Sequence, residues 1–363
     1  MAVAGAAAVA LAATACLSGC SSLGYYWQTA TGHLRVMSAA RPIDDWILDR
    51  EAPERLKARL ALSRRIRDYA VRELKLPDNP SYRRYADLHR SAVVWNVVAA
   101  PAYSVTLKTW CFPVTGCVSY RGYFDEQDAR AEAAQLAAAG YESNVYPVPA
   151  YSTLGWMNWA GGDPLLNTFI YFPEGELARL IFHELAHQVV YAKDDTTFNE
   201  SFATAVERLG GERWLQTQAS EAARRDYAEY NGRRVQFRAL ALATRRRLEN
   251  IYADTSGVER DAKKQAALQD FRAGYAKLRD SWGGDAARFR GYDQYVEHVN
   301  NASFGAQAAY DELVPGFEAL FEREGRDWQR FYDAAKRLAA LPKEERHRQL
   351  GAPIIKKAGE TGG

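Results

Sequence analysis

The hydrophobic and polar positions of the first eighty residues follow helical spacing after an N-terminal apolar run. This pattern predicts an amphipathic helical segment over residues 24–47 and a second helix over residues 53–74. Pro77 and Pro80 then interrupt it, because proline lacks the N–H that a helix interior requires. Residues 20–80 are therefore expected to form an N-terminal helical unit.

A mixed segment with strand-like patterns follows. Residues 93–107 and 118–124 are rich in β-branched and aromatic side chains, which favour strands. An alanine-rich stretch over residues 125–139 is typical of a helix ended by Gly140, and residues 141–148 again have a strand pattern. This order of elements predicts a small mixed sheet.

Two helices are predicted next, joined by a polar turn at residues 193–195. The first covers residues 176–191, which contain no glycine or proline, and Pro173 suits its start. The second covers residues 198–209, after two threonines that can cap it. The first helix would be buried against a core, because apolar residues recur in it at helical spacing. They are Leu177, Leu180, Ile181, Leu185 and Val189.

Long charged helices dominate from Gly211 onward, with a break near residues 281–284. The predicted fold class is therefore α+β: mostly helical, with a small mixed sheet over the helix pair and a helical C-terminal lobe. We assign the α/β core to residues 81–210, the lobe to residues 211–350 and a disordered tail to residues 351–363.

The composition fits a folded chain and argues against nucleic-acid binding. Of the 363 residues, 47% are hydrophobic and 12% aromatic, which is ample for a core. The formal net charge is only +2, and basic residues mostly alternate with acidic ones along the helices. No nucleic-acid partner is expected, and the sequence does not indicate an oligomeric state.

The first helix of the pair carries two histidines four residues apart, His183 and His187. This spacing stacks both imidazoles on one helix face, where they can bind one Zn²⁺ ion. Glu184 follows the first histidine and lies about 100° around the helix axis, beside the metal. It is the candidate general base that takes a proton from zinc-bound water. The alternative is a pair of structural histidines without a metal.

A catalytic zinc has three protein ligands and one open position, so a third ligand is needed. Glu200 is the best candidate, because the tight turn between the helices brings it near the two histidines. A solvated charge is the alternative, but Glu200 lies between Phe198 and Phe202 on a mostly apolar helix. Glu207, two turns further along the same helix, is expected to lie about 10 Å from Glu200 by helix rise and therefore outside the zinc shell.

The chain resembles the gluzincin zinc peptidases through His183-Glu184-x-x-His187 and the later element Asn199-Glu200-Ser201-Phe202-Ala203. More closely, it resembles a bacterial family of predicted lipid-anchored aminopeptidases. The other matching blocks are residues 111–117, 120–124, 151–156, 163–168 and 300–302. The resemblance implies one Zn²⁺ cofactor, a peptide substrate and peptide-bond hydrolysis, with aminopeptidase action as the leading activity.

The resemblance also implies a substrate-binding segment. Gluzincins place an edge strand that binds substrate before the zinc helix, which corresponds here to residues 151–168. Thr153, Gly155 and Asp163 are therefore candidate substrate-binding residues, and a buried strand without substrate contact is the alternative. Either Asp163 or Glu174 could bind a free N-terminal amine.

Two further roles need residues outside these elements. The oxyanion of the reaction needs a donor, for which Tyr310 is the candidate and His298 the runner-up. A second carboxylate usually orients a zinc histidine, but Thr204 stands where thermolysin-like enzymes carry that aspartate. The acidic Gly-x-Met-Glu-Asn element of the large zinc aminopeptidases is absent.

The N-terminus indicates export. Residues 1–20 contain no charged side chain and end in Leu17-Ser18-Gly19-Cys20, a lipobox. We predict a signal peptide over residues 1–19 and lipidation of Cys20, which would anchor the protein stably to a membrane. Ser21 indicates the outer membrane of a Gram-negative bacterium, with the mature domain in the periplasm. An uncleaved transmembrane helix is the alternative.

Cys111 and Cys117 are the cysteines that remain once Cys16 is removed with the signal and Cys20 is lipidated. An even pair in an oxidising compartment predicts a disulfide, and the proline and glycine between them suit a tight turn. A second metal site is the alternative, but these cysteines have no neighbouring histidine.

Together these features predict a periplasmic, lipid-anchored zinc peptidase. Two other functions stay open: a zinc endopeptidase that acts on periplasmic proteins, and a zinc-containing binding or assembly lipoprotein with little turnover.

Overall fold

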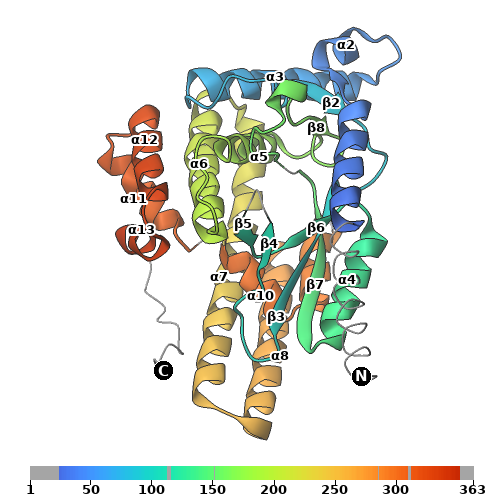
Figure 1. Ribbon diagram of the computed structural model, residues 1–363. Helices are drawn as coiled ribbons and strands as arrows, with labels where there is room; N and C mark the ends of the chain where they lie inside the picture. Colours follow the sequence, from blue (N-terminus) through green and yellow to red (C-terminus); the bar gives the residue numbers. More distant parts are fainter. Residues whose placement is uncertain (1–23, 113–115, 151, 285, 310–311, 352–363) are drawn as a thin grey trace, which may run out of the picture.

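The computed structural model of the protein describes residues 24–112, 116–150, 152–284, 286–309 and 312–351. The predicted signal peptide, Cys20 and Tyr310 lie outside these residues. Helices dominate the described chain and its sheets are small, so the predicted α+β, mostly helical class is confirmed (Figure 1). No helix in these ranges is long and apolar enough to cross a membrane.

The N-terminal part is helical, but a short strand interrupts it. A helix over residues 24–39 is followed by β1 (Arg41–Pro42) and α2 (Ile43–Leu48). The break falls at Pro42, which has no backbone N–H to continue a helix and pairs in β1 with Arg84 of β2 (Arg84–Ala86). The predicted helical segment over residues 24–47 therefore consists of two helices.

The next helix, α3 (Glu54–Arg72), matches the second predicted helix and follows Pro53 at its N-cap. Its apolar face, which includes Leu60 and Ile66, is fully buried in the main core. Below α3 in Figure 1, β8 (Leu165–Leu166) pairs parallel with β2 and completes a small sheet with β1.

A second sheet has the order β6-β3-β7, in which β6 (Arg121–Tyr123) and β7 (Tyr141–Val148) are both antiparallel to β3 (Val94–Pro101). Both faces of β3 are covered. Val97 packs with residues of α4 (Glu126–Ala138), and Val98 packs with Ala302 of α10 (Asn301–Ala309). This sheet is antiparallel throughout and is built around one buried central strand, with β7 at its edge, whereas the sheet of β1, β2 and β8 is the mixed one.

A separate hairpin pairs β4 (Trp110–Phe112) with β5 (Gly116–Val118) and carries the predicted disulfide between Cys111 and Cys117. The predicted strand over residues 118–124 is divided here. Val118 ends β5 and Arg121 begins β6, so Tyr120 lies at the junction of two sheets.

The predicted helix pair forms the centre of the molecule. It consists of α5 (Glu174–Ala186) and α6 (Thr196–Thr217), which pack against each other within the main core. The packing is close at Gly210 of α6, where a Cβ atom would lie 2.7 Å from Leu74 and 3.1 Å from Phe182.

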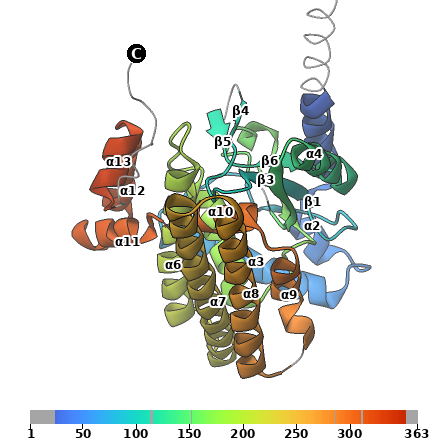
Figure 2. The same cartoon turned by 90° about the horizontal axis from the view of Figure 1, so that it is seen from below.

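The C-terminal part is helical, as predicted. The long helices α7 (Glu221–Asp254) and α8 (Gly257–Trp282) run side by side and project from the rest of the molecule (Figures 1 and 2). The shorter helices are α9 (Arg290–Glu297), α11 (Val314–Arg323), α12 (Trp328–Ala339) and α13 (Lys343–Gln349). Of these, α11 packs against α6 and supports the helix pair from outside.

Candidate active site

The helix pair brings the three predicted ligands together. His183 lies in the last turn of α5, His187 is the C-cap of that helix, and Glu200 lies near the start of α6. The Nε2 atoms of the two histidines are 3.2 Å apart, and the Oε2 atom of Glu200 lies 3.4 Å from one and 3.7 Å from the other. All three side chains are nearly buried. They form a cluster that could hold a metal ion.

The electrostatics of the cluster suit a cation. Burial lowers the pKa of His187 to about 4, so its imidazole stays neutral, the form that binds metals. Burial would raise the pKa of Glu200, but its interactions with His187 and His183, which include a hydrogen bond to His183, outweigh burial and hold that pKa below its usual range. Glu200 therefore stays a carboxylate, which a cation could neutralise.

Glu207 contacts His183 at Nδ1, whereas Glu200 lies near Nε2 of the same ring. The Oε2 atom of Glu207 lies 2.9 Å from Nδ1 of His183. Burial would lower the pKa of His183, but the carboxylates of Glu200 and Glu207 outweigh it and hold that pKa well above its usual range. Arg179, one turn before His183 on α5, forms an ion pair with Glu207. Glu207 is therefore not in the ligand cluster, as predicted, but its contact with a ligand was missed.

Glu184 occupies the position expected of a general base. It follows His183 on α5, lies outside the ligand cluster, and lines the same cavity as the three ligands. Burial raises its pKa to about 7, although the charge of His183 acts in the opposite direction. A carboxylate with that pKa can both accept and release a proton near neutral pH.

A cavity of about 580 Å³ lies over the cluster. Its walls come from distant parts of the chain: Tyr25 from the helix over residues 24–39, Tyr120 from the β5–β6 junction, Trp156 from the segment over residues 152–162, here called the rim, and Tyr191 from the α5–α6 loop. A smaller cavity of about 330 Å³ also reaches His183 and Glu184. It is lined further by Arg179, Glu207, Arg234 and Arg238. The ligand cluster and Glu184 are thus flanked by an aromatic cavity and an arginine-bearing one.

The family model described as "Putative aminopeptidase" matches residues 24–350. The chain belongs to this family. Its description supports a peptidase, in agreement with the resemblance drawn from the sequence. No curated protein and no solved structure matches the chain.

The rim segment before α5 forms part of the cavity wall in this family member. Thr153 and Leu154 line the larger cavity. Gly155 has a φ of 78°, and a Cβ atom there would lie 3.3 Å from Oε1 of Gln188, so the rim rests on the chain just after α5. The predicted substrate-binding role of Thr153 and Gly155 stays a prediction.

Asp163 and Glu174, the two candidates for binding a free amine, line neither cavity. Asp163 is buried beneath the rim, and its carboxylate accepts a hydrogen bond from the backbone N–H of Thr153 at 3.1 Å. Glu174 accepts a hydrogen bond from Nε1 of Trp214 at 3.1 Å. Asp163 therefore supports the rim from below.

Tyr310, the candidate oxyanion donor, lies outside the described residues. The runner-up, His298, is 69% exposed and lines neither cavity. Among the described tyrosines, Tyr25, Tyr26, Tyr120 and Tyr191 line the larger cavity and Tyr146 lines the smaller one. With 21 tyrosines in the chain, composition gave no basis for choosing them.

Proposed function

We propose that the protein is a zinc-dependent peptidase, with aminopeptidase action as its leading activity. The arrangement of His183, His187 and Glu200 around one position, with Glu184 beside them in a cavity wall, supports this best. Two imidazole nitrogens and one carboxylate oxygen are a donor set of catalytic zinc. The family description points to the same class of reaction.

The residues present fit such an ion. His187 is held neutral and Glu200 is held ionised, which are the forms in which an imidazole and a carboxylate bind a metal ion. Bound zinc would supply a Lewis acid that polarises the scissile carbonyl and makes the attacking water more acidic. Glu184 would take the proton of that water and deliver it to the leaving amine.

An endopeptidase is the second candidate. The two cavities both reach Glu184 and share residues 148 and 150 in their walls. A substrate chain could therefore extend to either side of the scissile bond, which an endopeptidase requires and an aminopeptidase does not.

We also propose that Cys20 carries a lipid anchor and that the protein faces the periplasm from the outer membrane. The lipobox supports this, as does the disulfide of Cys111 and Cys117, since disulfides persist in oxidising compartments. We expect Cys20→Ala to prevent incorporation of a labelled fatty acid. Label in the variant would contradict the anchor without affecting the proposed chemistry.

The activity is tested with purified full-length protein in detergent. We expect it to cleave aminoacyl-amide reporters, to lose activity with a chelator, and to regain it with one equivalent of zinc. Cleavage of N-blocked peptides instead would favour the endopeptidase. If neither substrate class is cleaved by zinc-loaded protein, the peptidase proposal is wrong and a binding lipoprotein is favoured.

A further inference from the structure

Tyr120 lies in the wall of the larger cavity and belongs to neither a helix nor a strand. It lies between β5 and β6, and it shares the cavity wall with His183, Glu184, His187 and Glu200. On its C-terminal side, Arg121 begins β6 and pairs with Val97 of the buried strand β3. The backbone that carries Tyr120 is therefore held by the second sheet.

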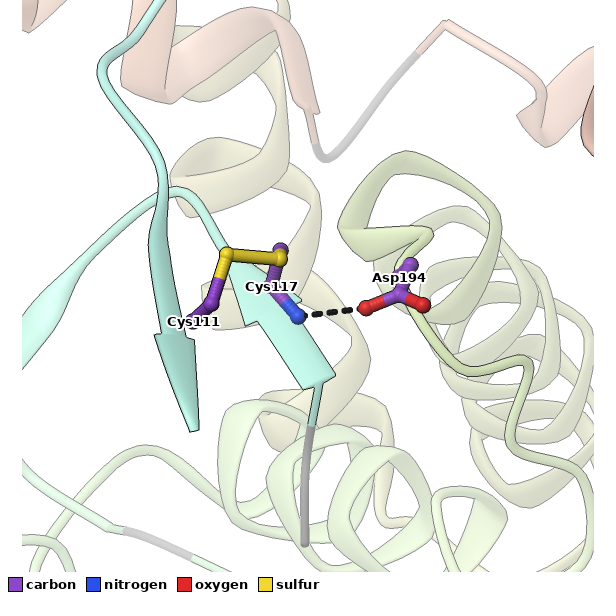
Figure 3. Close-up of a disulfide and its surroundings, with 3 residues drawn as sticks. All are labelled: Cys111, Cys117 and Asp194. Carbon is purple, nitrogen blue, oxygen red and sulfur yellow. Dashed lines mark hydrogen bonds between the residues drawn. A yellow bond between two sulfur atoms is a disulfide. The ribbon is translucent and has the colours of Figure 1, made fainter. Parts of the chain in front are cut away.

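The N-terminal side of Tyr120 is held by the disulfide hairpin. The backbone N–H of Cys117 donates a hydrogen bond of 2.6 Å to Oδ1 of Asp194, in the loop between α5 and α6 (Figure 3). Gly116 permits this approach, because it has a φ of 74° and a Cβ atom there would lie 2.3 Å from the same oxygen. Since that loop connects His187 to Glu200, the hairpin is fastened to the segment that joins two of the ligands.

The ring and the hydroxyl of Tyr120 have different surroundings. The ring packs with Tyr146 against a cluster formed by β3 and Ala302 of α10. Burial raises the pKa of Tyr120 well above its usual range, and the negative charges of Glu200 and Glu184 raise it further. The phenol therefore stays protonated and remains a hydrogen-bond donor at neutral pH.

The hydroxyl of Tyr120 also differs from that of its neighbour. The hydroxyl of Tyr146 accepts a hydrogen bond of 3.4 Å from Nδ2 of Asn96. No residue within the described ranges makes a hydrogen bond to the hydroxyl of Tyr120. Tyr120 is partly exposed and lines the cavity that contains the base and the ligand cluster, so its hydroxyl is suited to bind a group of the substrate there.

We propose that Tyr120 is a catalytic residue that donates a hydrogen bond to the oxyanion formed on the scissile carbonyl. The inference rests on the proposed peptidase function. As the water oxygen bonds to the carbonyl carbon, the carbonyl π electrons move to oxygen, and Glu184 receives the water proton. The Tyr120 proton stays on the phenol, whose hydrogen bond strengthens as the charge develops.

The test is Tyr120→Phe in the full-length protein, with three readouts. We expect kcat to fall about 100-fold, as for loss of one oxyanion donor, with KM nearly unchanged and zinc content equal to that of the wild type. A phosphinic peptide analogue of the tetrahedral state should bind about 100-fold more weakly, because it presents the same charged oxygen.

Tyr123→Phe is the matched control, because it removes from β6 a hydroxyl that lines neither cavity and already donates a hydrogen bond to Glu132 at 3.1 Å, and it should keep kcat within about threefold. The inference would be overturned by unchanged kcat and analogue affinity in Tyr120→Phe, or by a large loss of kcat in Tyr310→Phe alone. In either case a wild type that cleaves peptides would still be a peptidase. If the wild type cleaves no peptide, the proposed function fails. Analogue affinity that is then equal in wild type and variant, or absent in both, would overturn the inference as well.

Discussion

Nδ1 of His183 lies 2.9 Å from the carboxylate of Glu207, on the side of the imidazole opposite to Glu200. A carboxylate at Nδ1 selects the tautomer with its proton on that nitrogen and leaves Nε2 to bind a metal. Glu207 is in turn fixed by Arg179, whose side chain is 4% exposed. The cluster is therefore supported by a second layer of charged residues on the same two helices.

We predict that Glu207→Ala lowers zinc affinity about 10- to 100-fold without removing a ligand, because the imidazole of His183 loses the group that orients it. Competition with a chromophoric chelator measures the affinity. Glu212, an exposed glutamate on the same helix, is the control, and Glu212→Ala should leave zinc affinity unchanged. Equal affinities for Glu207→Ala and wild type would show that the contact is only structural.

The base and the ligands should separate in their effects on the metal. Glu184→Gln is expected to keep zinc and to lose turnover by about 10²- to 10⁴-fold, because it removes a proton acceptor that is not a ligand. His183→Ala and Glu200→Ala should instead lose the metal, since each removes a donor atom of the cluster. Metal analysis of the purified variants decides this. Zinc loss in Glu184→Gln as complete as in His183→Ala would contradict the assigned roles.

The helix pair and its three candidate ligands could be predicted because their signals are local. The spacing of His183 and His187 fixes their common face, and Glu200 stood out as a charge on an apolar helix. Helix limits were less certain. His187 caps α5 although the periodic pattern continues to residue 191, since periodicity does not show where backbone hydrogen bonding ends.

The supporting residues could not be predicted because they depend on how helices and sheets pack. Nothing in the sequence around Glu207 distinguishes it from a glutamate on a solvated helix face. The packing of α5 against α6 places it beside His183 and Arg179. Tyr120 reaches the cavity through a hairpin that docks more than 70 residues away in sequence, at Asp194. No local pattern records such a contact.

Asp163 gives a pH-dependent contribution to stability. Burial raises its pKa from 3.8 to about 6, against the hydrogen bonds from Thr153 and Ser152. The folded state then binds more protons than the unfolded state between about pH 4 and 6, so this contribution is complete below pH 4 and is lost as pH rises through 6. We expect the free energy of unfolding of the wild type, measured with urea relative to that of Asp163→Asn, to fall by roughly 2–3 kcal/mol across that pH range. A difference that is constant from pH 4 to 7 would contradict the raised pKa.

The link between the disulfide hairpin and the α5–α6 loop should affect turnover through Tyr120. Asp194→Ala removes the acceptor for the N–H of Cys117, so the segment that carries Tyr120 is held less firmly. We expect kcat to fall about 3- to 10-fold with zinc content unchanged, as for loss of about 1 kcal/mol of positioning. In the Tyr120→Phe background the same change should cost nothing more, because the donor is already gone. An equal, additive loss in both backgrounds would show that Asp194 acts independently of Tyr120.

Asp195 ties the C-terminal helices to the ligand-bearing helix and should be a strong determinant of stability. Its side chain is fully buried, caps α6 at the N–H of Phe198, and contacts Arg346 at 3.3 Å and His347 at 2.9 Å, both on α13. Asp195→Ala leaves the buried guanidinium of Arg346 without its carboxylate and removes a helix cap, so we expect a loss of about 3–5 kcal/mol in the free energy of unfolding. Lys343, which is 51% exposed and 3.9 Å from the same carboxylate, provides the control, and Lys343→Ala should cost less than about 1 kcal/mol. If urea unfolding gave similar losses for the two variants, α13 would not be held through Asp195, and the stability of the start of α6 would have to come from the apolar contacts of Phe198 and Phe202 with α11.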